Sequence, residues 1–255
     1  MTTPVRHRIR QSFERAAATY DAAAWVQRLA CHTLARELPS ALPATACLLD
    51  AGCGTGYALP LLRSCAPQSL ILSCDLAPAM LARVAEPSAR LLSDLENLPL
   101  PAQGLDLYWS SLAWQWCDPQ RALAEARRVL RPGGYFLLCS LGPETFVELR
   151  TAFSAVDDYP HTLAFQSPEM MRELAHQAGF PGLRLIRQRE TLHYPDVRSL
   201  LRAVKAVGAN QLGHGRRTGL LGRDAFARLR AAYEVQRATA GLPLSYDLFF
   251  LFGTG

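Results

Sequence analysis

Lysine is almost absent from this chain of 255 residues, because Lys205 is the only one and arginine supplies the rest of the positive charge. Long apolar runs are absent as well, since none reaches the roughly 18 residues that would suggest a membrane span. The amino-terminal stretch 1–14 carries three arginines but no apolar core, which argues against a secretory signal. These absences predict a cytoplasmic protein with no membrane partner.

The cysteine and histidine patterns lack the spacing of a disulfide framework or a metal site. The seven cysteines are odd in number, none belongs to a C-x-x-C pair, and several fall in predicted strands. That pattern favours reduced, buried thiols over disulfides or zinc ligands. The six histidines show no ligand spacing either. We therefore predict that the protein holds no metal.

Apolar residues, in contrast, are plentiful at 49% of the chain, so a full core is available and wholesale disorder is excluded. A chain of this length suits one large α/β domain, with room for an insertion. We predict a single domain over residues 1–255.

A predicted buried strand, 47–50, runs directly into glycines at alternate positions. Asp50 ends the strand, and Gly52, Gly54 and Gly56 follow it, with Cys53 between the first two. Glycine lets a ligand approach the backbone closely, and the helix that follows offers unpaired N–H groups. A dinucleotide turn would have the spacing G-x-G-x-x-G. The spacing found here, D-x-G-x-G-x-G, instead resembles the glycine loop of class I S-adenosylmethionine-dependent methyltransferases. An ordinary glycine-rich turn is the alternative.

Asp75 ends the next predicted strand, 70–74, about 20 residues after the glycine loop, where a carboxylate can accept both hydroxyls of a ribose. It could also cap a helix predicted over 77–84, and both roles can hold together. Leu76 follows it in the expected cofactor site, and Met80 on that helix could face the adenine.

The resemblance also assigns residues to the adenine end of the cofactor. It implies that Asp94, after a short strand over 90–93, accepts from the adenine amino group, with the Leu95 amide beside it. Asp94 could instead be a simple turn residue. Ser110 ends a strand over 105–110, at the sheet edge where ligands bind in open α/β folds. Two tryptophans, Trp114 and Trp116, follow it and could line an acceptor pocket or simply pack.

The remaining periodicity continues the alternation of strands and helices. Strands are predicted over 135–140, 183–193 and 244–252, with helices over 119–130 and 167–178 between them. The resemblance implies an α/β fold: a Rossmann-like, seven-stranded, mostly parallel sheet with helices on both faces and an antiparallel last strand.

Two segments fall outside this core. Residues 1–40 read as helices that either cap the sheet edge or form a flap, with Tyr20 closing over the cofactor. About 50 residues separate the last two strands, and we predict that 194–242 is a helical lid. From residue 184 to 237 there are twelve Lys and Arg against four acidic residues. Such a surface suits nucleic acid, an anionic membrane or an acidic carrier protein.

Several stretches outside the cofactor motifs resemble the malonyl-[acyl-carrier protein] O-methyltransferase family of biotin synthesis. They are 10–21, 142–150 with Phe153, 156–161, 201–210, 215–223 and 241–246. The resemblance implies S-adenosylmethionine as cofactor and methyl transfer to the free carboxylate of a malonyl thioester. It also implies an acidic acyl-carrier protein as partner, rather than nucleic acid or a membrane.

A carboxylate has a reference pKa of about 4, so it is ionised at neutral pH and needs no general base. It needs positioning and a cation. Arg216 and Arg217 in the predicted lid are the leading candidates because a guanidinium binds a carboxylate in bidentate fashion, with Lys205 and Arg202 next. Each could equally be a solvated or carrier-facing charge. The alternatives are a methyltransferase for a small free acid or a quinone precursor, and a cofactor-binding assembly factor without methyl transfer.

Overall fold

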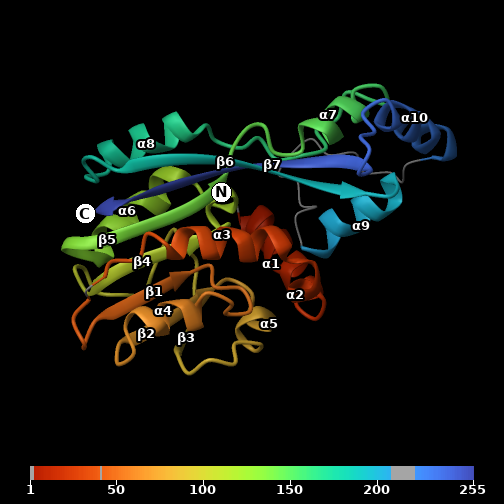
Figure 1. Cartoon of the computed structure of the whole chain (residues 1–255). Helices are drawn as coiled ribbons and strands as arrows, with labels where there is room; N and C mark the ends of the chain where they lie inside the picture. Colours follow the sequence, from red (N-terminus) through yellow and green to blue (C-terminus); the bar gives the residue numbers. More distant parts are fainter. Residues whose placement is uncertain (1–2, 41, 208–221) are drawn as a thin grey trace.

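A seven-stranded sheet forms the centre of the protein in the computed structural model, which describes residues 3–40, 42–207 and 222–255 (Figure 1). The strands are β1 (Cys47–Ala51), β2 (Leu70–Asp75), β3 (Ala89–Leu92), β4 (Leu105–Ser111), β5 (Leu130–Leu141), β6 (Arg184–Tyr194) and β7 (Leu242–Thr254). Their order is β3-β2-β1-β4-β5-β7-β6. Strand β7 runs antiparallel to both neighbours, and the other pairings are parallel. The predicted fold class is confirmed.

Helices cover both faces of the sheet, and each face has its own apolar core. The helices are α1 (Thr3–Ala16), α2 (Tyr20–Ala23), α3 (Trp25–Ala35), α4 (Leu59–Cys65), α5 (Pro78–Leu81), α6 (Pro119–Val129), α7 (Val147–Phe153), α8 (Pro168–Gln177), α9 (Val197–Ala206) and α10 (Arg223–Glu234), with a 3₁₀ turn η1 (Trp114–Trp116). Helices α3 and α4 pack on one face, and α6 and α8 pack on the other. No helix among the described residues is both long and apolar enough to cross a membrane.

Local chemistry explains where several helices begin. The Asp118 carboxylate accepts the N–H groups of Gln120 and Arg121 at the start of α6, and Pro119 occupies the first helical position. Ser167 likewise accepts the N–H of Met170 at the start of α8, as predicted. The helix predicted over 77–84 is the single turn α5. The amino-terminal segment 1–40, which the sequence predicts to be helical, contains three helices, with α2 and α3 separated at Ala24.

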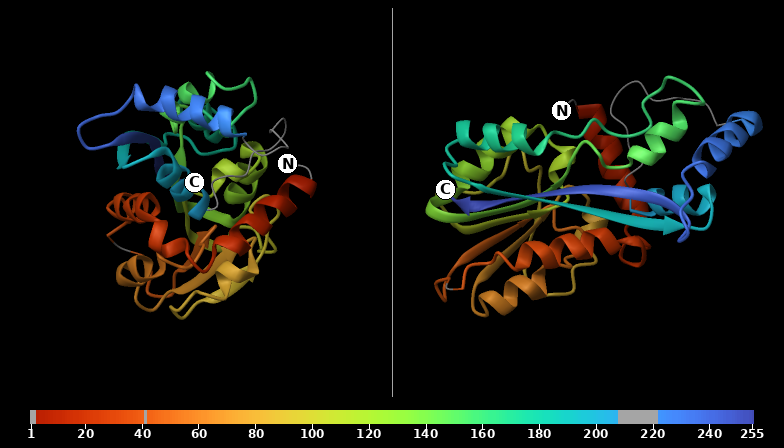
Figure 2. Two further views of the ribbon diagram at one scale, coloured as in Figure 1. Left: turned by 90° about the vertical axis from the view of Figure 1, so that its right-hand side faces the viewer. Right: turned by 45° about the horizontal axis from the view of Figure 1, so that its top comes forward.

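Strand β6 pairs with β7 over its whole length, and at one end of the two strands α7, α9 and α10 gather (Figures 1 and 2). Helices α9 and α10 lie between these two strands in sequence, inside the segment 194–242 that was predicted to be a lid. Helix α10 packs against α7. This helical cluster therefore lies at the carboxyl end of β5, the same edge of the sheet that carries the glycine loop at the end of β1.

Candidate active site

The glycine loop leaves β1 in a conformation that side chains resist. Gly52, Gly54 and Gly56 have φ values of 79°, 55° and 87°. A Cβ on Gly52 would stand 2.3 Å from the Cβ of Ala113, so the loop also requires glycine for space. The N–H groups of Gly52 and Cys53 donate to the carbonyl oxygen of Cys74 at 2.8 and 2.9 Å, which ties the loop to the end of β2.

A cavity of about 730 Å³ lies beside this loop, at the carboxyl ends of β1, β2 and β4, and is called the cofactor cavity below. Eight of the predicted site residues line it: Tyr20, Gly52, Gly54, Asp75, Leu76, Met80, Asp94 and Leu95. These eight residues come from four separate stretches of sequence and meet at one edge of the sheet, as the fold requires of a ligand site.

A smaller adjoining cavity contains Asp50 and Cys53 and shares Tyr20, Gly52 and Gly54 with the first. Asp50 is 2% exposed, and its Oδ2 atom has no hydrogen-bond partner among the described residues. Burial, and then the nearby charge of Asp75, raise the pKa of Asp50 to about 8. A buried carboxylate in this state favours a positively charged ligand beside it.

Asp75 is held by backbone donors at the rim of the cofactor cavity. Its Oδ2 accepts the N–H of Gly54 at 2.9 Å, and its Oδ1 accepts the N–H of Ala77 at 2.8 Å. Burial raises the pKa of Asp75, and the N–H donors of Ala77, Gly54 and Leu76 oppose that rise. The alternative role as helix cap is wrong in detail, because Ala77 occupies the cap position of α5. Asp75 instead forms a local turn two residues before it.

Two predicted site residues, Gly56 and Ser110, line neither cavity. A Cβ on Gly56 would lie 3.0 Å from Leu59 and 3.2 Å from Val84, so this glycine lets the neighbouring chain pack closely. The buried Ser110 hydroxyl donates to the carbonyl oxygen of Ala51 at 2.6 Å, between β4 and β1. Both residues therefore contribute to the packing and hydrogen bonding of the glycine loop, outside the two cavities.

Helix α1 contributes residues that sequence reasoning missed. Arg6 forms an ion pair with Asp94 at 2.8 Å and another with Glu96, and Arg6, Ile9 and Phe13 all line the cofactor cavity. No local motif signals this contact, because Arg6 and Asp94 are brought together only by the tertiary fold. The amino-terminal helix thus covers the predicted adenine end.

A larger space of about 1090 Å³, called the acceptor chamber below, adjoins the cofactor cavity. The two share Phe13, Tyr20, Leu112 and Trp116, and Tyr20 also lines the cavity around Asp50. Burial raises the pKa of Tyr20, so its phenol stays protonated at neutral pH. Trp116 lines both spaces, whereas Trp114 is buried and packs on Tyr108 and Phe136. The two tryptophans therefore divide the two roles left open from the sequence.

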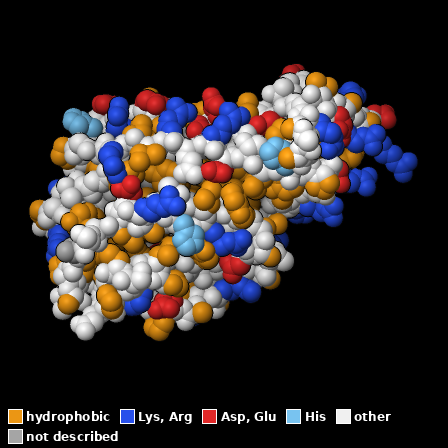
Figure 3. Space-filling model, viewed as in Figure 1, with side chains coloured by type: hydrophobic (Ala, Val, Ile, Leu, Met, Phe, Trp, Pro, Cys, Tyr) orange, Lys and Arg blue, Asp and Glu red, His pale blue; other side chains and the backbone are white. Residues whose placement is uncertain are grey.

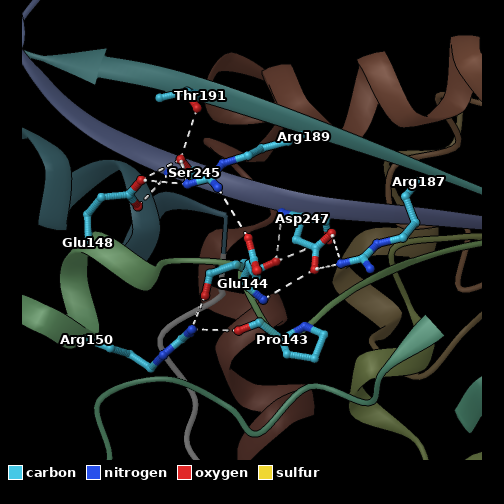
Figure 4. A network of polar contacts seen from close by, with 10 residues as sticks. Pro143, Glu144, Glu148, Arg150, Arg187, Arg189, Thr191, Ser245 and Asp247 are labelled. Atoms are coloured by element: carbon cyan, nitrogen blue, oxygen red, sulfur yellow. Dashed lines mark hydrogen bonds and ion pairs between the residues drawn. The ribbon is translucent and has the colours of Figure 1, made fainter. Parts of the chain in front are cut away.

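A polar network, called the clasp below, fixes the far wall of the chamber (Figure 4). The buried Glu148 carboxylate accepts the N–H and the hydroxyl of Ser245 and pairs with Arg189 at 3.4 Å. Asp247 pairs with Arg187 at 3.3 Å, and its carbonyl accepts the Gly142 N–H. These bonds tie the loop after β5 to β7.

The clasp also aligns two aromatic side chains. Phe146 has a φ of 60°, which is costly for a bulky residue. Its N–H donates to the carbonyl of Ser245 at 2.7 Å, and its ring meets Tyr246 with centroids 5.0 Å apart. Both rings line the acceptor chamber. Two of the stretches that resemble the carboxyl methyltransferase family therefore form one wall.

The predicted cations do not line these cavities in the described part of the chain. Lys205 and Arg202 are exposed on α9, and Arg216 and Arg217 lie outside the described residues. Of the described residues that line the chamber, His161 alone can carry a positive charge. It lies 2.7 Å from Asp157 and stacks on Phe153 at 3.5 Å between centroids.

Comparison with known proteins agrees with this geometry. A family model described as "Methyltransferase domain" matches residues 49–138. The chain is 56% identical, over 98% of its length and 95% of the relative's, to the malonyl-[acyl-carrier protein] O-methyltransferase of Dechloromonas aromatica (strain RCB). The chain belongs to the malonyl-[acyl-carrier protein] O-methyltransferase family. The resemblance found in the sequence is confirmed.

Two other comparisons extend this family assignment. The biotin biosynthesis bifunctional protein BioHC of Cellvibrio japonicus (strain Ueda107) is 37% identical over 96% of the chain, which spans 49% of that protein. A crystal structure of a SAM-dependent methyltransferase from Thermotoga maritima has a TM-score of 0.57 at 19% identity, with 96% of this chain and 99% of that chain covered, and shows the shared fold. Membership of this family makes the enzyme an S-adenosylmethionine-dependent O-methyltransferase.

Proposed function

We propose that this enzyme methylates the free carboxylate of a malonyl group carried as a thioester on an acyl-carrier protein, early in biotin synthesis. The products are the malonyl methyl ester and S-adenosylhomocysteine. The observation that carries the proposal is the junction at Tyr20, where the cofactor cavity meets a chamber walled by family-specific residues. The enzyme's seven cysteines are all free thiols, as is typical of proteins in the reducing cytoplasm.

The residues around the loop fit S-adenosylmethionine. Asp50 would pair with the ammonium of the methionine part, which accounts for a buried oxygen that has no partner among the described residues. Gly52, Cys53 and Gly54 would present bare backbone to the same part. Asp75 would accept the ribose hydroxyls.

The adenine would lie at the other end of the cavity. Leu76 and Met80 would flank its ring there, with the Leu95 amide beside it. Asp94 would accept from the adenine amino group, in exchange for part of its ion pair with Arg6.

The cofactor supplies an electrophilic methyl group on a sulfonium sulfur. The acceptor carboxylate is already ionised, so the protein's part is to align the two groups and exclude water. Phe13, Tyr20 and Trp116 at the junction would do both. Removing water from a carboxylate also makes its oxygen a better nucleophile. A protonated Tyr20 would act by position and hydrogen bonding, and not as a base.

A cation must hold the acceptor carboxylate loosely, because methylation removes the charge and tight ground-state binding would oppose reaction. Arg216 and Arg217 remain the proposed residues for this role. If they hold it, replacing either with Ala should raise KM for the malonyl thioester and leave the affinity for the cofactor unchanged. An equal loss of both would point to a folding defect.

The basic end of the molecule would receive the carrier protein. Lys and Arg side chains gather around α9 and α10 (Figure 3). The exposed ones on these two helices are Arg198, Arg202, Lys205, Arg223, Arg228 and Arg230. An acidic carrier would be attracted to them, and exposed charges are screened over about 8–10 Å at physiological salt. We expect KM for the carrier-bound substrate to rise several-fold between low and high salt, and a flat response would contradict this docking role.

The decisive experiment is incubation with labelled S-adenosylmethionine and malonyl-carrier protein, followed by the mass of the carrier. We expect a mass gain of one methyl ester on the malonyl carrier and none on the unacylated carrier. Free malonate, tested in parallel, is the control substrate. Methylation of the free acid without methylation of the carrier-bound group would contradict the proposal.

A further inference from the structure

Beyond the acceptor chamber lies a second space, open to solvent, that no step above uses. It is called the outer cleft here, and its empty volume is about 950 Å³. Pro143, Arg150 and Phe153 form one side, and the loop 157–165 forms the other. Its rim residues Ser154, Asp158, Tyr159, Pro160 and Ala164 are exposed.

A single layer of side chains separates the outer cleft from the acceptor chamber. Five residues line both spaces: Phe153, His161, Thr162, Leu163 and Phe165. Phe153 and His161 stack against each other, and Asp157 holds the His161 ring from the cleft side. Phe153 is buried on α7, whereas His161 to Phe165 belong to a loop without helix or strand. The loop side of this layer can therefore move more easily than the helix side.

The spaces form a sequence from the sheet edge to solvent. The cofactor cavity meets the chamber at Phe13, Tyr20 and Trp116, and the chamber meets the outer cleft at the layer around His161. An acceptor whose carboxylate lies at the Tyr20 end must direct the rest of its chain toward the opposite end. A thioester on a long arm would thus point at the outer cleft.

We propose that the outer cleft is the port through which the pantetheine-thioester arm of the carrier protein reaches the chamber, and the site that binds this arm. The inference rests on the proposed function. The arm is narrow and alternates amide groups with short apolar segments. The cleft offers the matching mixture, with polar Ser154 and Asp158 beside aromatic Tyr159 and Phe165. The His161 ring would turn aside to admit the arm and leave Phe153 in place.

Charge supports the same position for the carrier. Helix α7, which forms one side of the cleft, packs against α10, as both views show (Figure 2). Arg223, Arg228 and Arg230 are exposed on α10. An acidic carrier resting on α10 would have the cleft beside it, so the arm could enter without crossing the sheet.

The first test narrows the port. Ala164 is exposed and lines only the outer cleft, so Ala164→Trp should raise KM for malonyl-carrier protein at least tenfold and leave the cofactor Kd unchanged. Ala124→Trp, at an exposed position on α6 across the sheet, is the matched control. An Ala164→Trp enzyme with the same KM as the control would overturn the proposal.

The second test uses chemical cross-linking and does not require a bulky side chain to obstruct the outer cleft. None of the seven cysteines lines the chamber or the cleft, so Thr162→Cys places a thiol on the proposed path. A carrier whose pantetheine ends in a bromoacetamide should then cross-link to this variant, and not to the parent or to Ala124→Cys. If the parent methylates malonyl-carrier protein and Thr162→Cys forms no cross-link, the port is wrong and the function stands. If the parent does not methylate that substrate at all, the proposed function itself fails.

Discussion

Two pairs of carboxylates lie in two adjoining regions of this protein, and their charges are compensated differently. Asp50 and Asp75 lie at the glycine loop, and no described Lys, Arg or His forms an ion pair with either. Glu148 and Asp247 lie at the acceptor wall, where Arg189 and Arg187 pair with them. Asp50, Glu148 and Asp247 are buried, and Asp75 is half-buried. Among the residues that the structure describes, the second pair alone has arginine partners.

The difference fits the proposed binding site at the glycine loop and a structural joint between α7 and β7. A buried charge without a partner is expensive, and here the cost appears as a pKa of about 8 for Asp50. A fold tolerates such a group where a ligand later compensates it. A buried charge with an arginine and several N–H donors needs no ligand, and it holds two segments in register. The same residue type therefore reports two different functions.

The largest expected effect comes from removing Asp75. Asp75→Ala should raise the cofactor Kd by about 100-fold, because it deletes hydrogen bonds to a charged group worth about 1.5–3 kcal/mol each. Calorimetry measures the affinity. Asp118→Ala, which removes only the cap of α6, is the control and should leave the Kd unchanged. An unchanged Kd in Asp75→Ala would remove Asp75 from the ribose site.

A substitution in the clasp should lower the stability of the protein and not its affinity for the cofactor. Glu148→Ala leaves the buried N–H and hydroxyl of Ser245 without their acceptor and removes one of the two carboxylates beside Arg189, and we expect the free energy of unfolding to fall by about 3 kcal/mol. The cofactor Kd of the folded protein should change little. Glu144→Ala is the matched control, since Glu144 makes an exposed pair with the same arginine, worth less than about 1 kcal/mol. Equal losses in the two variants would end the contrast between the two pairs.

A smaller, pH-dependent effect is expected for Asp50→Asn. The folded pKa of about 8 lies above the ordinary value near 4, so the folded protein keeps this proton while the unfolded chain loses it. The contribution of Asp50 to stability should therefore decline as pH rises from 4 to 8 and level off above 8. Asparagine does not titrate, so the variant should be more stable than the parent by about 1–2 kcal/mol at pH 8, in the absence of cofactor.

The same variant should bind the cofactor about tenfold more weakly, since it loses an ion pair to the ammonium. Chemical denaturation at several pH values and calorimetry measure the two effects. A variant that is more stable than the parent but binds the cofactor more weakly would support the contrast between the two pairs of carboxylates. A pH-independent stability difference would break it.

The residues around the glycine loop could be predicted from the sequence because they belong to local patterns. The glycine spacing, the strand ends at Asp50 and Asp75, and the order of strands all lie within short windows. Tertiary contacts were not readable: Arg6 on Asp94, Gly56 against Val84, and the Ser110 hydroxyl on Ala51 join distant segments.

The acceptor half depended on resemblance. The stretches 142–150 and 241–246 resemble the family in sequence, but the sequence does not indicate that they contact each other. In the structure, the Glu148 carboxylate accepts the N–H of Ser245 and joins them. Polarity patterns do not reveal which carboxylate finds which arginine. The leading cations, Arg216 and Arg217, lie outside the described residues, so their role stays a prediction.

The ion pairs of Arg6 can influence which step limits the rate of the enzyme. Arg6 fastens α1 over the cofactor cavity at Asp94 and Glu96, so release of spent nucleoside past this helix would require these ion pairs to break. Product escape, and not bond making, would then limit turnover, and the enzyme would be sensitive to accumulation of its own by-product.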